Sequence, residues 1–599
     1  MFKVALRYSA RPTISDIGAM IIACPFCGSL KWPKEKMNCC GNGDIQLAPA
    51  DIIPPALAAT IYSPTVMSSI RAYNMSMAMA SIGHQNKSLP DGMFVLGGRT
   101  YHRIGSMMPQ ANSAHAFAQI YVLDVDQATD RRLAIFNDLN RAVLQQLHAA
   151  MIGCNPLIRR FVQAARSDVP HLVWHCNDDV STMQIGAIVA EPGSKRDIVI
   201  QRVSGDIIFI DDGHALYHPL AYPLLFPTGS PGWHDRRRVC SVDLLRERCI
   251  TLTEWGRYIL MHNGSPSHLQ RCGKLALEFY CDIWAQVESR NAQFHRSEQQ
   301  QAKYRAARVA AVEDQLSAGV PASEIGTPVI RLPSSFVGSA RFYQQLYMDA
   351  MALPKKFGKP DLFVTFTCNP SWPEIAAAIP AGSHWKFHPD IVSRVFMLKL
   401  RSLLDDIAKK HIFGAVCAFV YRIEWQARGL PHAHILVILK DKVLSSRHID
   451  AVVSAEIPDP AAEPELLELV TKHMLHPECD VDTSHSCRRD DSNRVIDCHR
   501  RFPKAMSRET VIIQDGYPQY MRRGRFQTRR RNGHVVTDNW VVSYNKCVTA
   551  IILRFHCGHA LAGSYCCDIE LTAMWKYARI SGASNMCINT HSKHPTALW

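Results

Sequence analysis

Two histidines separated by one residue, His432 and His434, are the most suggestive reactive groups in the sequence. They fall in an apolar stretch, 432–439, that predicts a β-strand, and residues 415–425 predict a second strand before the Gly-Leu-Pro turn. Because residues i and i+2 of a strand point to the same face, both imidazoles should project side by side. The pattern predicts a β-hairpin that presents a pair of imidazoles.

The preceding strand offers acidic and amide partners for this pair. Glu424 and Gln426 share one strand face and would lie roughly opposite the histidines. Two imidazoles and one carboxylate leave coordination positions open, which is typical of a catalytic divalent-metal site. Glu424 is the stronger third ligand because it brings charge. The alternative is a pair of hydrogen-bonded core histidines.

A cysteine-rich stretch near the start predicts a second kind of metal site. The chain has 20 cysteines, and its first residues lack the apolar core of a secretory signal, so clustered thiols favour metal binding over disulfides. Cys24, Cys27, Cys39 and Cys40 could hold one tetrahedral zinc ion, with the glycines after Cys40 allowing the chain to bend. The alternative is four free or buried thiols.

A later set of ligand-type residues predicts another zinc site. It consists of His476, Cys479, Cys487 and Cys498. The His-x-x-Cys start suits a shared ion, although the later spacings are long, and His499 could replace Cys498.

An arginine run follows this set. Within ten residues the chain has six arginines, namely Arg522, Arg523, Arg525, Arg529, Arg530 and Arg531. Aromatic residues stand among and beside them, so the run suits phosphate contacts and base stacking along single-stranded DNA. A solvated hairpin tip is the alternative.

Charge and composition agree with a polyanionic partner. The chain has 599 residues, a formal charge of +14 and a pI near 9.0, although many basic proteins bind no nucleic acid. With 47% hydrophobic and 20% charged residues it is globular, not disordered. No apolar run is long enough for a membrane span, and we expect no membrane partner or small-molecule substrate.

The elements that would position these groups predict an α+β fold. Residues 361–367 read as a strand, Ser371 and Glu374 as a capping box that starts a helix, and Asp390 as the cap of a further helix with an apolar stripe. Residues 117–123 and 198–210 read as strands, 217–229 as an irregular core segment and 270–316 as helix. We expect five segments: a cysteine-rich zinc-binding head (1–50), an α+β region (51–235), a helical connector (236–320), the sheet-based core with the His-Ala-His hairpin (321–445), and a Cys/His, basic and tyrosine-bearing region (446–599).

The hairpin motif carries a family resemblance. Residues 429–436, Gly-Leu-Pro-His-Ala-His-Ile-Leu, resemble the His-hydrophobic-His motif of the replication-initiator endonucleases of Helitron transposons. Further segments resemble the Helitron helicase-like N-terminal region, namely 222–227, 332–339, 365–370, 455–460 and 501–504. In order and spacing the likeness covers about residues 20–555.

The resemblance implies an antiparallel-sheet nuclease core that nicks and joins single-stranded DNA in rolling-circle fashion. A tyrosine would attack the scissile phosphate with help from Mg²⁺ or Mn²⁺, and His432 and His434 match the metal-binding pair. The second cysteine set resembles a family insertion expected to hold structural zinc. The helicase domain of full-length elements is expected to be missing, since no phosphate-binding loop of the Gly-x-x-x-x-Gly-Lys type occurs.

The tyrosine region departs from the family pattern. The family places two tyrosines in a Lys-Tyr-x-x-Lys-Tyr helix, whereas this chain keeps only Tyr577 near that place, with Tyr565 as the next candidate. An ordinary helix tyrosine is the alternative reading of Tyr577. The expected function is an impaired nicking and joining endonuclease acting in the nucleus. The alternatives are a catalytically inactive DNA-binding remnant and a zinc-stabilised interaction protein.

Overall fold

The computed structural model describes about three fifths of the chain. The described residues are 17–36, 39–45, 47, 52–79, 81–85, 97–103, 117–166, 199–201, 207–209, 213–234, 248–261, 267–297, 334–337, 339–425, 429–442, 445–476, 498, 501–512, 518–530, 533–546 and 569–571. Tyr565, Tyr577, Gln426, Cys479, Cys487, His499 and Arg531 lie outside this set.

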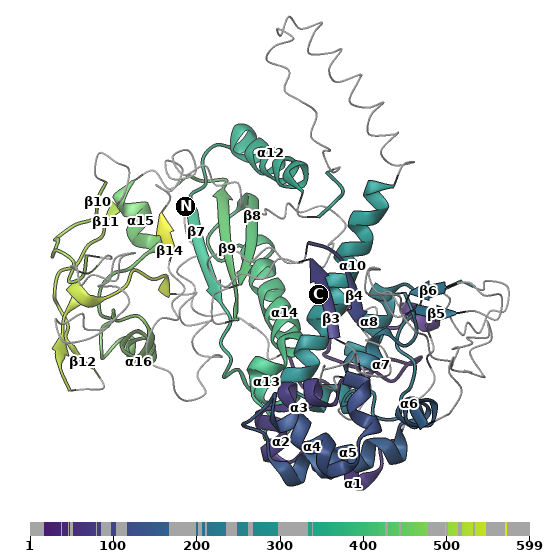
Figure 1. Ribbon diagram of the computed structural model, residues 1–599. Coiled ribbons are helices and arrows are strands. Elements are labelled where there is room, and N and C mark those ends of the chain that lie inside the picture. Colours follow the sequence, from purple (N-terminus) through teal and green to yellow (C-terminus); the bar gives the residue numbers. More distant parts are fainter. Residues whose placement is uncertain are drawn as a thin grey trace, which may run out of the picture.

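The described residues form two hydrophobic cores. The first belongs to a helical lobe at the bottom of Figure 1 and gathers apolar side chains from between Cys39 and Val287. Its helices are α1 (Pro55–Ile61), α2 (Pro64–Ser68), α3 (Ile70–Met77), α4 (Val125–Leu133), α5 (Arg141–Cys154), α6 (Pro156–Arg166), α7 (Tyr217–Ala221), α8 (Leu252–Leu260), α9 (His268–Arg271) and α10 (Lys274–Arg296). Two strand pairs accompany them: β3 (Ser81–Gln85) with β4 (Gly97–Arg103), and β5 (Val199–Gln201) with β6 (Ile207–Phe209).

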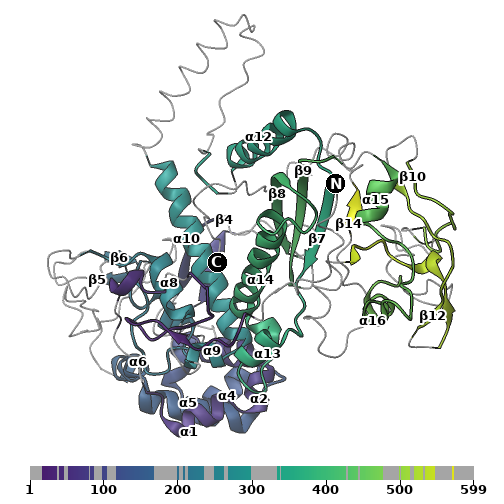
Figure 2. The same ribbon diagram turned by 180° about the vertical axis from the view of Figure 1, so that it is seen from behind.

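The second core belongs to a sheet lobe. Its antiparallel sheet has the order β14-β7-β9-β8, with β7 at Leu362–Thr367, β8 at Val416–Trp425, β9 at Pro431–Leu439 and β14 at Ile569–Leu571. Helix α14 (Pro389–Ala408) lies against one face of this sheet, as Figure 2 shows from behind. The other helices are α12 (Ala340–Phe357), α13 (Pro373–Ala378), α15 (Ser446–Val452) and α16 (Pro464–His473).

Alternating burial along β9 decides which face of the sheet carries chemistry. Ala433 and Ile435 are fully buried with the α14 side chains Val395 and Leu403, whereas His432 and His434 are half-buried on the opposite face. The two histidines therefore lie on the sheet face away from α14. The sequence-predicted α+β class is confirmed as a mixture of helices and small antiparallel sheets.

The basic region past residue 500 adds short strand pairs at the left of Figure 1. These are β10 (Val511–Ile512) with β11 (Pro518–Gln519) and β12 (Thr528–Arg529) with β13 (Val535–Val536). The 3₁₀ turn η5 (Asp538–Trp540) follows, and Val541 and Tyr544 belong to the second core. This region therefore folds onto the sheet lobe.

The cysteine-rich head, residues 17–47, contributes to both cores. Its hairpin of β1 (Ile22–Ala23) and β2 (Leu30–Lys31) leads to Trp32, which is buried in the second core. Cys39, Cys40 and Ile45 are buried in the first core, beside the 3₁₀ turn η1 (Gly41–Gly43). The division of the chain into five segments remains a prediction. The described residues show two hydrophobic cores, and this head contributes side chains to both.

One predicted strand is wrong. Residues Phe117–Val122 form a 3₁₀ helix, η2, instead of a strand. Ile120 and Tyr121 are both buried, and the Tyr121 hydroxyl donates to the Met77 carbonyl at 2.6 Å. A strand would send these neighbours to opposite faces, so the tertiary contacts select the helical turn. The strand pair predicted around residues 198–210 is confirmed as β5 and β6.

The predicted helix caps are also corrected. Helix α13 begins at Pro373 with Trp372 at the N-cap, and no side chain caps it. Asn369 instead accepts a hydrogen bond from the Ser371 amide at 2.9 Å, which forms a turn before the helix. Asp390 lies in the first turn of α14, whose N-cap position is His388. The segment 217–229, which was predicted to be irregular, contains one short helix, α7.

No described helix combines the length and the apolar character that a membrane crossing needs. Of the helix expected over 270–316, α10 accounts for the part up to Arg296. The rest lies almost wholly outside the described residues.

Candidate functional site

The pair of imidazoles lies between two neighbouring strands. His432 is in register with Thr367 of β7 and with Glu424 of β8, and His434 is in register with Thr365 and Arg422. The two rings lie 4.4 Å apart between centroids and are nearly perpendicular. The predicted side-by-side placement is therefore confirmed, and the pair does not lie in the core.

Glu424 is shared between a cation and an imidazole. Its carboxylate lies 3.7 Å from Nε2 of His434 and 3.0 Å from Nε of Arg422. Burial lowers the pKa of His434 despite the nearby Glu424 carboxylate, so the neutral, ligand-competent imidazole is favoured near pH 7. The side chains of His434 and Glu424 are 31% and 38% exposed, so solvent and a substrate can reach them.

His432, His434 and Glu424 have the ligand types that suit a divalent metal ion, but their ligand atoms are not close enough together to share one. Two imidazoles and a carboxylate are ligands that Mn²⁺ and related cations accept. Among the described residues, however, only the four cysteines form a group whose ligand atoms all lie within 4.8 Å of one another. A metal ion at His432, His434 and Glu424 would therefore require at least one of their three ligand atoms to move closer to the others.

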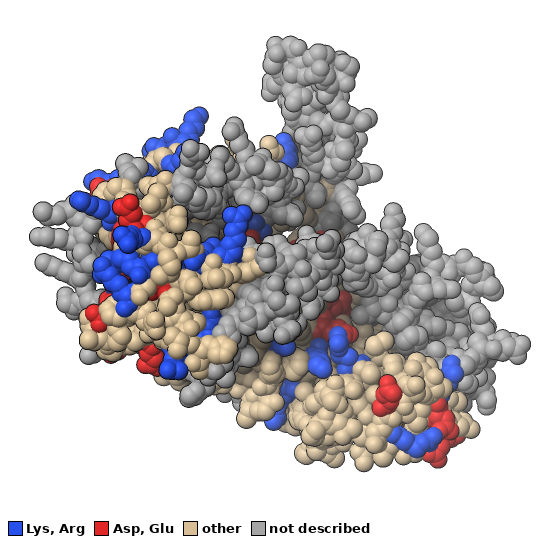
Figure 3. All heavy atoms as spheres, turned by 90° about the vertical axis from the view of Figure 1, so that its left-hand side faces the viewer, with Lys and Arg blue, Asp and Glu red and all other residues tan. Residues whose placement is uncertain are grey.

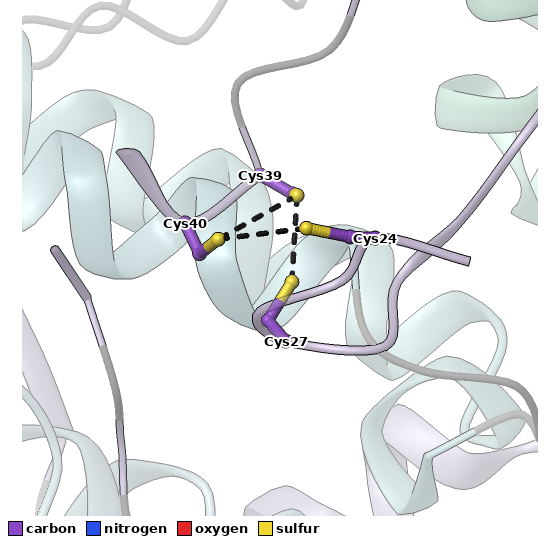
Figure 4. Close-up of side chains that lie close together, drawn as sticks. All are labelled: Cys24, Cys27, Cys39 and Cys40. Atoms are coloured by element: carbon purple, nitrogen blue, oxygen red, sulfur yellow. Dashed lines mark hydrogen bonds between the residues drawn. The ribbon is translucent and has the colours of Figure 1, made fainter. Parts of the chain in front are cut away.

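The cysteine cluster, Cys24, Cys27, Cys39 and Cys40, has the geometry of a zinc site (Figure 4). Neighbouring sulfur atoms lie 3.4 Å apart for Cys27 and Cys39, 3.7 Å for Cys24 and Cys40, and 3.9 Å for Cys39 and Cys40. A tetrahedral ion with Zn–S bonds of about 2.3 Å holds its sulfurs about 3.8 Å apart. The four thiols are thus already spaced for one zinc ion.

The protonation of these thiols also points to a cation. Burial disfavours the Cys24 thiolate, yet hydrogen bonds, including the Cys27 and Phe26 amides, lower its pKa to about 6. Burial raises the pKa of Cys39 and brings that of Cys40 to about 11. Without a metal ion the cluster would therefore keep protonated thiols packed against one another.

An ion pair docks the head on the sheet lobe. Arg394 of α14 contacts the Glu35 carboxylate at 2.8 and 3.0 Å, and its Nη2 donates to the Leu30 carbonyl at 2.9 Å. The same guanidinium lies 4.8 Å from the ring centroid of Trp32. These contacts hold the base of the cysteine-bearing loop against α14.

The second predicted zinc set is brought together in part. Cys498 Sγ lies 3.7 Å from Nε2 of His476, and both residues are almost fully buried. The His476 ring stacks on Phe502, with centroids 4.2 Å apart. Two of the four predicted ligands thus meet at a distance that suits a shared ion.

The arginine run is divided between buried and exposed positions, which corrects two of the expected DNA contacts. Arg522 is 5% exposed and donates to the carbonyls of Ala455, Val541 and Asp538, and burial lowers its pKa to about 10. Its guanidinium joins backbone segments inside the lobe and is not available to phosphate.

Arg523 is the second corrected position. Its Nε and Nη2 atoms contact the two oxygens of Glu456 at 2.7 and 2.5 Å. This two-point contact occupies the guanidinium edge that a phosphate would need. The neighbouring aromatic residues Tyr520 and Phe526, expected to stack on bases, pack against the second core instead.

Two of the later arginines, Arg525 and Arg529, face outward. Arg525 and Arg529 are exposed, and Arg530 lies over the Trp540 ring with its Cζ atom 4.9 Å from the centroid. Figure 3 shows Lys and Arg side chains outnumbering acidic ones on the face of the molecule that carries this region. Within the arginine run, Arg525 and Arg529 are therefore the described residues best placed for phosphate.

A family model covers the part of the chain that holds the histidine pair. Residues 255–437 match the Helitron helicase-like domain at the N-terminus. This segment is similar to a Helitron helicase-like N-terminal domain. The match runs from α8 to β9 and so includes β7, β8, α14 and both histidines. The family resemblance is thereby confirmed for this segment. No curated protein matches the chain.

Four neighbours of the histidine pair were not anticipated from the sequence. Phe363, Thr365 and Thr367 come from β7, and Arg422 comes from β8. Both strands were predicted from the sequence. The polar residues at alternate positions, Thr365 and Thr367 on β7, were a sequence signal that one face of this strand lies outside the core. Only the strand register shows which of these side chains meet the imidazoles.

Proposed function

We propose that this chain binds single-stranded DNA and, through the face of the sheet that carries His432 and His434, nicks it. The Helitron helicase-like match over residues 255–437 supports the family activity, and the imidazole pair beside Glu424 is the observation that carries the chemistry. The side chains of His434 and Glu424 are partly exposed on this face, which is the side from which a DNA strand would reach them. The net charge of +14 and the exposed Arg525 and Arg529 support a polyanionic substrate. From such a substrate we infer that the protein acts in the nucleus.

The proposed reaction is a transesterification. A tyrosine oxygen, with Tyr577 first and Tyr565 second, attacks the scissile phosphorus, loses its proton and becomes joined to the 5′ end. The bond to the 3′ oxygen breaks, and that oxygen takes up a proton and leaves as a 3′-OH. His432, His434 and Glu424 would hold a divalent cation, Mg²⁺ or Mn²⁺, which polarises the phosphate when bound.

Adduct formation tests this function directly. Incubating the chain and labelled single-stranded DNA with Mn²⁺ should give a covalent protein–DNA species that survives denaturing electrophoresis. His432→Ala should abolish the adduct because one of the two imidazole ligands is lost, whereas the exposed His384→Ala should leave it unchanged. Tyr577→Phe should abolish it as well, and an adduct that persists would move the attack to Tyr565. An adduct that survives His432→Ala would contradict the proposed site.

A catalytically inactive DNA-binding remnant is the second candidate. The family's second tyrosine is missing, and the ligand atoms of His432, His434 and Glu424 are not closed around an ion. This candidate predicts salt-dependent DNA binding with no adduct under either Mg²⁺ or Mn²⁺.

The exposed arginines should set the salt dependence of binding in both cases. Replacing Arg525 and Arg529 together with alanine should reduce the slope of log affinity against log salt by about 1.4, because each phosphate contact on a single strand contributes about 0.7. Arg141→Ala, on α5 of the helical lobe, is the control and should leave the slope unchanged. An unchanged slope in the double variant would show that these arginines do not contact phosphate. Fluorescence anisotropy with a labelled oligonucleotide at several salt concentrations measures it.

A further inference from the structure

Strand β7 presents two hydroxyl groups to the two imidazoles. Thr367 is in register with His432 and Thr365 with His434, so both pairs lie on the same face of the sheet. Thr367 Oγ1 lies 2.6 Å from Nδ1 of His432, and Thr365 Oγ1 lies 3.3 Å from Nδ1 of His434. The same ring nitrogen is engaged in both histidines.

This repeated contact has a consequence for the other ring nitrogen. A neutral imidazole has one N–H donor and one nitrogen with a free lone pair, and the hydrogen bond of the donor fixes which is which. A threonine hydroxyl can accept from Nδ1–H, which leaves the lone pair on Nε2. In His434 that Nε2 atom is the one that lies 3.7 Å from Glu424.

A third side chain of β7 restrains the ring plane. Phe363, two residues before Thr365, stacks on His434 with centroids 5.0 Å apart and an interplanar angle of 21°. The outward-facing residues of one strand thus limit both the rotation and the tilt of His434. Alternation along β7 places all three on the histidine face, while Val364 and Phe366 are buried in the core.

We propose that Thr365 and Thr367 are positioning residues, which hold both imidazoles with Nδ1 protonated and so leave each Nε2 to a divalent cation. The proposal rests on the proposed function, since it assigns the cation to the same histidine pair. Outer hydrogen-bond partners of metal-binding histidines typically change metal affinity 10- to 100-fold when they are removed. Because the contact of Thr367 is the shorter one, its removal should have the larger effect.

Isosteric variants separate this role from simple sheet stability. Thr367→Val removes the hydroxyl but keeps the β-branched shape that suits a strand, and Thr367→Ser keeps the hydroxyl. Thr528→Val is the matched control, because Thr528 makes a hydroxyl hydrogen bond to Thr471 at 2.8 Å away from the histidines. The thermal midpoint of each full-length variant should be recorded beside the binding data.

Calorimetric titration with Mn²⁺ gives the first readout. Thr367→Val should weaken Mn²⁺ binding about 10- to 100-fold, Thr367→Ser should restore it to within about threefold, and Thr528→Val should not change it. Unchanged binding in Thr367→Val, or a serine variant as weak as the valine variant, would overturn the proposal.

The protonated ring nitrogen gives a second readout without any metal ion. Full-length protein labelled with ¹⁵N at histidine should show His432 with its proton on Nδ1, with the signal assigned by its loss in His432→Ala. Thr367→Val should move His432 toward the other tautomer, and an unchanged tautomer would overturn the proposal. If the unmodified chain binds no Mn²⁺ while this tautomer shift occurs, the assignment of a cation to the histidine pair and the proposed function are wrong. The positioning of His432 by Thr367 would still stand.

Discussion

Lys399→Met should lower the free energy of unfolding of the sheet lobe by about 3–5 kcal/mol. Lys399 lies on α14, its ammonium contacts the Glu374 carboxylate at 2.6 Å, and the two side chains are only 1% and 6% exposed. The ammonium also lies 5.0 Å from the ring centroid of Trp372. Replacing the lysine would leave a buried carboxylate without its cation, and that desolvation cost is the reason for the large effect.

Matched variants distinguish the buried pair from an ordinary ion pair. Lys409→Met, on a side chain 73% exposed and paired with Asp405, should change stability by less than about 0.5 kcal/mol. Adding Glu374→Gln to Lys399→Met should recover part of the loss, because the uncompensated charge is then gone. Denaturant unfolding followed by tryptophan fluorescence measures all three, and equal losses for Lys399→Met and Lys409→Met would contradict the explanation.

Loss of the zinc ion should unfold the cysteine-rich head. The purified chain should contain zinc at the cysteine cluster, and Cys39→Ser should lower the content by one ion per chain because three thiolates bind it far more weakly. Structural zinc contributes about 10–16 kcal/mol to the folding of small zinc-binding peptides, so the buried contacts of Cys39, Cys40 and Ile45 alone should not keep this loop folded. Atomic absorption measures the metal content.

Proteolysis shows where the effect of zinc loss appears. In Cys39→Ser, cleavage should become fast within residues 17–47. The pairing of Glu35 with Arg394 of α14 should weaken as well, because Glu35 lies at the base of this head. Cys249→Ser is the control, since Cys249 is exposed and outside the cluster, and it should keep both the zinc and the resistance. Equal zinc content in the two variants would contradict the assignment.

Local spacing in the sequence was sufficient for several features. Two histidines two positions apart in an apolar strand had to share a face, and the 3.6-residue stripe of α14 had to face the sheet. The spacing of Cys24, Cys27, Cys39 and Cys40 likewise indicated one tetrahedral site. These features were predictable because they depend on the periodicity of single elements or on short loops.

Tertiary structure decided the features that depend on two distant segments. The sequence could not show that Arg522 is buried against backbone carbonyls while Arg525 and Arg529 face solvent, because a charge pattern carries no information on packing. Nor could it show that Phe117–Val122 becomes a 3₁₀ helix, since buried contacts outweighed strand propensity there.

The surroundings of the histidine pair illustrate the same division most clearly. Sequence alone placed the two imidazoles on one strand face with Glu424 across the turn. The register of β7 against β9, which pairs residues 65 to 75 positions apart, decided that Thr365 and Thr367 meet the imidazoles. A shift of one residue would have turned both hydroxyls into the core, so the long-range strand pairing set the chemistry of this site.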